Sequence, residues 1–216
     1  MSEQMLLDEL KNLHLEIHST DPAPSNENER QAELTIRSFQ QTVNSLIMSD
    51  IPIKIIFMSL FYFWFKLEAD MQRVSDTKIN AKLKNPDVLL KETISLIKST
   101  VDSYEDNLQS GQMQTLGQNI DMLKLLITDD MIDCKLPYDE LKEKTEKVNL
   151  CIAGVIKGFL DQSYNHEIIA NVLFNNWLRL SAFNSGITEK YYQKIEYYFE
   201  EVTVALRAHM FKVDNQ

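Results

Sequence analysis

Glycine and proline are scarce in this sequence, whose 216 residues include only five of each. Both residues build the tight turns that join short β-strands, so a fold made of many such strands is disfavoured. Leu, Lys, Glu, Gln, Ile and Met recur throughout, and these residues favour helices. The hydrophobic fraction of 44% is enough for a substantial core. We therefore predict an all-α fold that forms a single domain over residues 1–216.

Cysteine is also rare, with only Cys134 and Cys151 present. Two cysteines are too few for a disulfide scaffold, and a chain of this length does not need one. The first residues, MSEQMLLDELK, contain no basic leader followed by an apolar segment, so a secretory signal peptide is not expected. We therefore expect a cytoplasmic protein. Cys151 falls on the apolar stripe of a predicted helix, and we expect it to be buried.

Basic residues are outnumbered, since 22 Lys and Arg stand against 32 Asp and Glu and give a net charge of −10. This charge opposes binding to the phosphate backbone of a nucleic acid. The one basic cluster consists of Lys78, Lys82 and Lys84. It is short and lacks interleaved aromatic residues, so we interpret it as a solvated connection and predict no nucleic-acid partner.

Apolar residues recur at helical spacing along most of the chain. Asn26, with Glu29 three residues later, is a typical helix start. The pattern predicts a bundle of seven or eight helices. We also expect a mobile loop near residues 19–28 and a frayed tail after residue 212. The predicted helices span about 3–18, 26–48, 51–71, 85–109, 112–127, 138–160, 165–183 and 188–212.

The helix predicted at about 51–71 is apolar on all sides. Between Ile55 and Phe65, Ser59 is the only polar residue. At about 1.5 Å per residue this run covers little more than half of a hydrocarbon layer roughly 30 Å thick, so a transmembrane span is not expected. A helix that is apolar all round belongs inside a bundle. We therefore predict that it is the central helix.

Asp129, Asp130 and Asp133 form a D-D-x-x-D sequence. This motif resembles the Asp-rich motif of isoprenoid synthases, whose carboxylates hold magnesium ions that bind a substrate diphosphate. The resemblance covers five residues and implies Mg-dependent binding of a prenyl diphosphate. The second metal motif of that family lacks its last ligand here, because Tyr192 takes that position. The alternative is that the aspartates cap the start of a helix, where their charge favours the helix dipole.

His14 and His18 are one helical turn apart, a spacing that suits ligands of a metal or a haem iron. The sequence FYFWFKLE at 61–68 is similar to the aromatic helix that faces the haem in heme oxygenases. Gly154 and Gly158 would match the glycine-rich distal helix of that family, although its G-D-x-S-G-G sequence is absent. The resemblance implies a haem held by His14 or His18. Alternatively, the two glycines mark a close contact between helices.

The last third of the chain contains aromatic residues interspersed with acidic ones. Where such side chains are exposed, they suit a protein partner, because tyrosine offers a large contact area at little entropic cost. The alternative is that the aromatic residues pack in the core. The candidate partner-binding residues are Trp177, Arg179, Tyr191, Tyr197, Tyr198 and Glu200.

These observations favour a non-enzymatic protein-interaction module, such as an adaptor, a chaperone-like protein or a regulatory subunit of a larger assembly. A protein partner and no cofactor are expected, and the oligomeric state stays open. Two alternatives remain. One is a heme-oxygenase-like protein that binds haem or a small ligand, and the other is a magnesium-dependent protein that binds a prenyl diphosphate.

Overall fold

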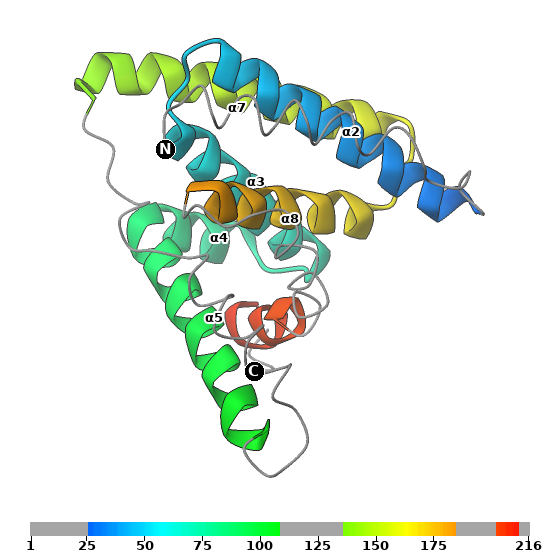
Figure 1. The fold of residues 1–216 in the computed structure, drawn as a ribbon, viewed down its shortest axis with the longest axis vertical. Coiled ribbons are helices and arrows are strands. Elements are labelled where there is room, and N and C mark those ends of the chain that lie inside the picture. The colour runs from blue at the N-terminus through cyan, green and yellow to red at the C-terminus, as the bar shows by residue number, and fades with distance from the viewer. Residues whose placement is uncertain (1–25, 109–135, 185–201, 212–216) are drawn as a thin grey trace.

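The structure, a computed structural model, describes residues 26–108, 136–184 and 202–211. These residues form seven helices and no strand, which confirms the predicted all-α class (Figure 1). No helix in the described ranges is long and apolar enough to cross a membrane. The helices are α2 (Glu27–Met48), α3 (Ile53–Met71), α4 (Asp76–Leu83), α5 (Pro86–Leu108), α7 (Tyr138–Asp161), α8 (His166–Asn184) and a helix at 202–210.

Four of these helices form a two-layered bundle (Figure 1). The helices α2 and α7 lie side by side in one layer, and α3 and α8 lie in the other. Helices that are consecutive in the chain make few contacts with each other. Instead, α2 and α3 each pack mainly on α7 and α8. The α2–α3 pair and the α7–α8 pair therefore hold each other in place.

Two hydrogen bonds show that α2 and α7 run antiparallel. Near the start of α7, Lys144 Nζ donates to the carbonyl of Asp50, just beyond the end of α2, at 2.9 Å. Beyond the other end of α7, the amide of Asn165 donates to Oε1 of Gln31, near the start of α2, at 3.0 Å. Each end of α7 is thus tied to the opposite end of α2.

The core lies between α3 and α8. In α3 only Lys66 and Asp70 are exposed, and in α8 only Asn171 is exposed between Ile168 and Leu180. The helix predicted at about 51–71 is central, and α8 lies beside it, so the two form a central pair. The second member was missed because Asn175, Asn176 and Arg179 give α8 a more polar composition than α3. Asn176 is nevertheless buried, and its side chain donates to the carbonyl of Val172 in the same helix.

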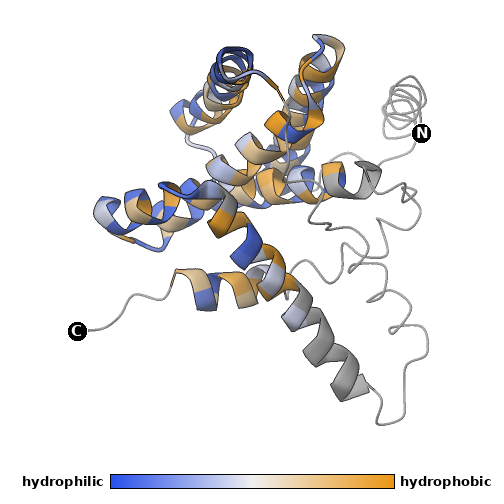
Figure 2. Ribbon diagram, turned by 90° about the vertical axis from the view of Figure 1, so that its left-hand side faces the viewer, coloured by the Kyte–Doolittle hydropathy of each residue, from blue (hydrophilic) through white to orange (hydrophobic). Residues whose placement is uncertain are grey.

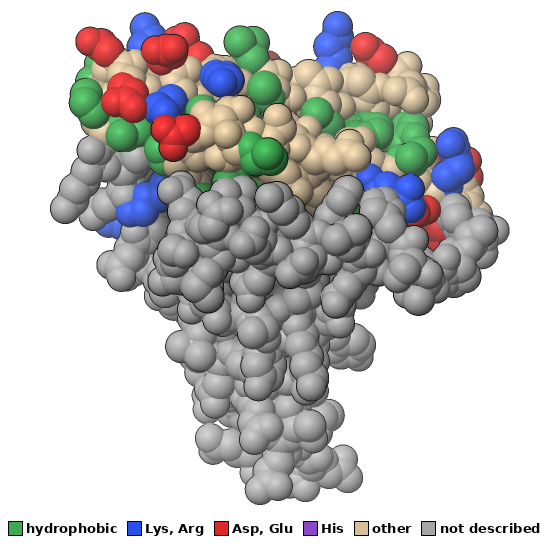
Figure 3. Space-filling view, turned by 45° about the horizontal axis from the view of Figure 1, so that its top comes forward, with side chains coloured by type: hydrophobic (Ala, Val, Ile, Leu, Met, Phe, Trp, Pro, Cys, Tyr) green, Lys and Arg blue, Asp and Glu red, His purple; other side chains and the backbone are tan. Residues whose placement is uncertain are grey.

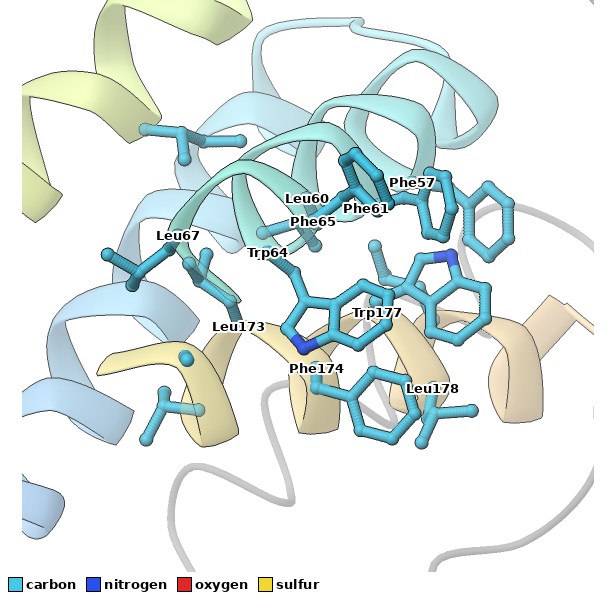
Figure 4. Packing of buried hydrophobic residues seen from close by; sticks show 14 of the residues in the cluster. Phe57, Leu60, Phe61, Trp64, Phe65, Leu67, Leu173, Phe174, Trp177 and Leu178 are labelled. Atoms are coloured by element: carbon cyan, nitrogen blue, oxygen red, sulfur yellow. The ribbon is translucent and has the colours of Figure 1, made fainter. Parts of the chain in front are cut away.

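Aromatic rings fill the space between α3 and α8 (Figure 4). The ring centroids of Trp64 and Phe174 are 4.8 Å apart. Those of Phe57 and Trp177 are 5.3 Å apart, and those of Phe61 and Trp177 are 5.4 Å apart. Each large buried ring removes much apolar surface from water, and tilted contacts of this kind add to that stabilisation.

The predicted boundaries of the described helices are close to those observed. The start of α2 shows the predicted cap, because Asn26 Oδ1 accepts a hydrogen bond from the amide of Glu29 at 3.0 Å. Residues 26–28 therefore belong to the helix cap and first turn, which corrects the end of the loop predicted at 19–28. The rest of that loop and the predicted tail lie outside the described residues, as do the helices predicted at 3–18 and 112–127.

A short helix, α4, replaces the solvated connection predicted around Lys78, Lys82 and Lys84. Asp76 lies in its first turn, where a negative charge favours the helix dipole. Ile79 is buried and attaches α4 to the core. The sequence pattern missed this helix because its eight residues include a single buried side chain, which leaves no apolar periodicity to detect.

Cys151 is exposed, contrary to the prediction that it is buried. The buried face of α7 consists of Val148, Ile152, Ile156 and Phe159. Successive residues of a helix point about 100° apart, so Cys151 lies to one side of the face that contains Ile152. Val148 and Phe159 of the predicted stripe are buried, whereas the positions between them that the bundle covers are Ile152 and Ile156 rather than Cys151 and Val155.

Three helices end with a residue other than glycine in the left-handed conformation. Asp50 follows α2, Arg73 follows α3 and Ser163 follows α7, with φ of 58°, 57° and 62°. This position in a helix end usually holds glycine, because a Cβ atom is disfavoured there. A chain with so few glycines therefore accepts strain at these three ends.

The end of α7 shows how the strain is offset. The amide of Ser163 donates to the carbonyl of Leu160 at 2.9 Å, and the amide of Tyr164 donates to that of Phe159 at 3.0 Å. The rings of Phe159 and Tyr164 are 4.8 Å apart, which provides the apolar contact typical of this motif. These interactions close the helix and turn the chain into α8.

We expect Ser163→Gly to stabilise the protein by about 0.5–1 kcal/mol, because glycine removes the Cβ strain at positive φ but loses more entropy on folding. Urea unfolding followed by circular dichroism measures the change. Gln162→Gly is the matched control, since Gln162 has φ of −92° and should lose stability on substitution. Equal effects of the two changes would contradict this account of the turn.

Candidate functional site

Glu68 is the only charged side chain buried in the described part of the structure, with 0% of its surface exposed. It follows Trp64 by one turn of α3 and therefore lies on the same apolar face. A carboxylate at such a position is costly unless a cation and hydrogen bonds compensate it.

Arg207, on the 202–210 helix, compensates this charge. Its Nε donates to Glu68 Oε2 at 2.9 Å, and its Nη2 donates to Glu68 Oε1 at 2.8 Å. The same guanidinium reaches α8, where Nη1 donates to Glu167 Oε1 at 3.2 Å and Nη2 to Asn171 Oδ1 at 3.3 Å. The hydrogen bonds to Glu68 raise the pKa of Arg207, while burial acts in the opposite direction. The pair is a two-pronged, charge-assisted contact, the strongest kind of side-chain hydrogen bond.

Apolar side chains of the 202–210 helix provide the rest of this contact. Val202, Leu206 and Met210 recur every four residues and are all buried. Phe211 follows them, and its ring centroid is 5.0 Å from that of Phe65. The opposite side of the helix is exposed at Val204. The helix is thus amphipathic and docks through one face.

We call the surface that holds this helix the docking surface. It combines aromatic groups, one buried carboxylate and a polar rim, and it is built from four helices of the fold. Figures 1 and 2 show the 202–210 helix lying against α5, beside the bundle. The docking surface consists of Trp64, Phe65 and Glu68 of α3, Lys82 of α4, Thr93 of α5, and Glu167 and Asn171 of α8.

Lys82 and Thr93 contact the far end of the docked helix. Lys82 Nζ donates to the carbonyl of Met210 at 2.9 Å, where a helix carries its partial negative charge. Thr93 Oγ1 lies 3.5 Å from Met210 Sδ. A pocket of about 420 Å³ opens beside this end, and its described lining includes Lys82, Glu92 and His209. Because charges of both signs line the pocket, it shows no preference for an anion or a cation.

Trp177 is fully buried, which corrects its assignment to an exposed partner-binding surface. Its ring packs between those of Phe57, Phe61 and Phe174. Arg179 is half-buried on the same helix. The sequence pattern was misleading here because aromatic residues at helical spacing serve a core and an interface equally well.

Gly154 and Gly158 lie on α7, and Gly154 is exposed. A Cβ atom added at either position would meet no other atom within 4 Å. Among the described residues, no close contact between helices is therefore made at these glycines. Trp64, in the aromatic sequence that resembles heme oxygenases, packs against Phe174, and Phe211 lies in T-shaped contact with it.

The remaining candidate residues lie outside the described residues. Within the described ranges, no group of three or more His, Cys, Asp or Glu side chains is arranged to hold a metal ion. The haem and magnesium alternatives therefore stay predictions. The residues concerned are His14, His18, Asp129, Asp130, Asp133, Tyr191, Tyr197, Tyr198 and Glu200.

The face that includes α2 and α7 carries charged side chains of both signs with hydrophobic ones between them (Figure 3). The most exposed large hydrophobic residues of these helices are Met48, Tyr138 and Leu150. Singly exposed apolar side chains are common on protein surfaces. This face therefore gives no specific indication of a ligand.

Comparison with family models, curated proteins and solved structures finds no match to this chain. Any inference about the function of this chain must therefore start from the docking surface. Sequence reasoning did not identify Glu68 and Arg207 as a pair, although a signal was present. Glu68 interrupts an apolar helix face, which indicates a buried charge, and Arg207 directly follows the inward-facing Leu206.

We expect Arg207→Met to destabilise the protein by about 3–5 kcal/mol, because it leaves a buried carboxylate without a cation. Glu68→Met should cost less, since Arg207 keeps Glu167 and is 22% exposed. The double variant should be close to wild type, because two apolar side chains replace the ion pair. A double-mutant cycle in urea tests this order, and strictly additive losses would contradict a direct pair.

We expect Gly154→Ala to stabilise α7 by about 1 kcal/mol, because alanine is the better helix former and the added methyl group meets no atom. Thermal unfolding measures the effect. Ala153→Gly, one residue earlier, is the matched control and should destabilise by a similar amount. A loss of stability in Gly154→Ala would mean that the glycine accommodates a close neighbour.

Proposed function

We propose that this chain is a helical protein-interaction module that binds an amphipathic helix of a partner protein. Adaptors, chaperone-like proteins and regulatory subunits of larger assemblies work in this way. The observation that carries the proposal is the docking surface, which holds a helix through apolar side chains at four-residue intervals and one central charge pair.

The chemistry of this surface matches helix-in-groove recognition. In that mode an amphipathic helix inserts apolar side chains spaced one helical turn apart, and polar contacts fix its register. Here the apolar anchors are Val202, Leu206 and Met210, and Arg207 fixes the register through Glu68. The aromatic rings of Trp64 and Phe65 provide the large contact area typical of binding hot spots.

The charge of the protein favours a basic partner helix. Glu68 and Glu167 both contact the guanidinium of Arg207, so the part of the docking surface around this arginine is acidic. The net charge of −10 attracts cationic segments during the encounter. The same charge disfavours a nucleic-acid partner. The low cysteine content agrees with a cytoplasmic location, which is part of the proposal.

A synthetic peptide tests the proposal with the full chain. The peptide has the sequence of residues 202–211, carries a fluorescent label and is stapled between positions 204 and 208, which face solvent. We expect saturable binding in fluorescence anisotropy. The affinity should be weak, because the tethered helix competes at an effective concentration of about 1 mM.

A matched peptide with glutamate in place of the arginine is the control. It keeps the apolar side chains but places a second negative charge against Glu68, so it should not bind. Equal binding of the two peptides would reveal non-specific apolar association and would contradict the proposal.

A further inference from the structure

We infer that the 202–210 helix is an internal competitor that a partner helix must displace, and that the partner carries an arginine directly after an apolar anchor. This inference rests on the proposed function and specifies its partner. The juxtaposition behind it is Glu68, buried in an aromatic surface, against Arg207, its only cationic contact in the described residues.

The buried carboxylate restricts which helices the surface accepts. An occupant without a cation at this position leaves Glu68 desolvated and unpaired, whereas an occupant with arginine satisfies both oxygen atoms. Lysine would supply the charge but not the fork of two parallel hydrogen bonds. The docking surface therefore gains its specificity mainly because helices without an arginine at this position bind with an energetic cost, which is a common source of specificity.

The charge pair contributes less to holding the chain's own helix than the buried Val202, Leu206, Met210 and Phe211 do. A buried ion pair often gives little net stability, because the cost of desolvating two charges offsets their attraction. The exposed rim contacts, from Glu167 and Asn171, add little in water. The helix is thus selected strictly through its charge, and a partner helix that offers the same apolar anchors and an arginine can replace each of its contacts.

The spacing of the anchors defines the partner further. Val202, Leu206 and Met210 lie one turn apart, Arg207 follows the middle anchor, and Phe211 follows the last. Phe211 contacts Phe65 and Trp64 with ring centroids 5.0 and 6.3 Å apart. A matching helix therefore begins with an apolar residue, and after three further residues comes an apolar residue followed directly by arginine. After two further residues it ends with two apolar residues, the second of which is aromatic.

Variants of the full-length chain test the displacement. Arg207→Ala weakens the tethered helix but leaves Glu68 available to the arginine of the stapled 202–211 peptide. We expect this variant to bind the peptide at least tenfold more tightly than wild type does. Amide exchange should rise in residues 202–211 and stay slow in α3 and α8. Arg30→Ala, which removes an exposed arginine paired with Glu27, is the control and should bind like wild type.

Phe211→Leu is a second variant, for use where circular dichroism shows that Arg207→Ala is unfolded. It removes the ring contacts without leaving a buried charge, and we expect about fivefold tighter binding of the peptide.

The outcomes separate the inference from the proposed function. Tighter binding by Arg207→Ala or Phe211→Leu supports both. Binding that is equal in wild type and in the folded variants overturns the internal competition and leaves the proposed function standing. A peptide that binds neither wild type nor any folded variant contradicts the proposed function itself.

Discussion

The aromatic contact between α3 and α8 is the interaction on which the other parts of the structure depend. Trp64, Phe174 and Trp177 are fully or almost fully buried, and their rings lie at distances typical of favourable aromatic pairs. Nearly all side chains of α3, and of α8 between Ile168 and Leu180, are shielded from solvent, so each helix has neighbours around it. The helices α2 and α7 cover one side of the pair, and the 202–210 helix brings Phe211 to Trp64 and Phe65 on another.

The buried negative charge of Glu68 is tolerated among apolar side chains because the 202–210 helix provides a positive charge beside it. Glu68 accepts two hydrogen bonds from Arg207, and Arg207 also reaches the first turns of α8. The pair therefore orients the 202–210 helix relative to both central helices. The cost of removing two charges from water offsets much of their attraction, so the contribution of the pair that the structure makes visible is this orientation.

Much of the fold followed from local patterns. The start of α2 at Asn26, the long apolar α3 and the boundaries of α5, α7 and α8 were predicted from capping residues and helical spacing. The candidate site was predicted less well. Trp177 proved to be core, Cys151 proved to be exposed, and Glu68 and Arg207 were not recognised as partners. The helix α4 was missed because it has one buried residue and no periodicity.

The reason for this division is physical. Capping and helical spacing depend on residues within a few positions of one another, so the sequence alone showed where helices start and which residues share a face. Which neighbour covers a face depends on segments far apart in the chain, as Glu68 and Arg207 illustrate, whose positions in the sequence differ by 139. Only the packing of α3 against α8 decided that Trp177 is enclosed. Only the docking of the 202–210 helix decided that the charge in the apolar α3 has a partner.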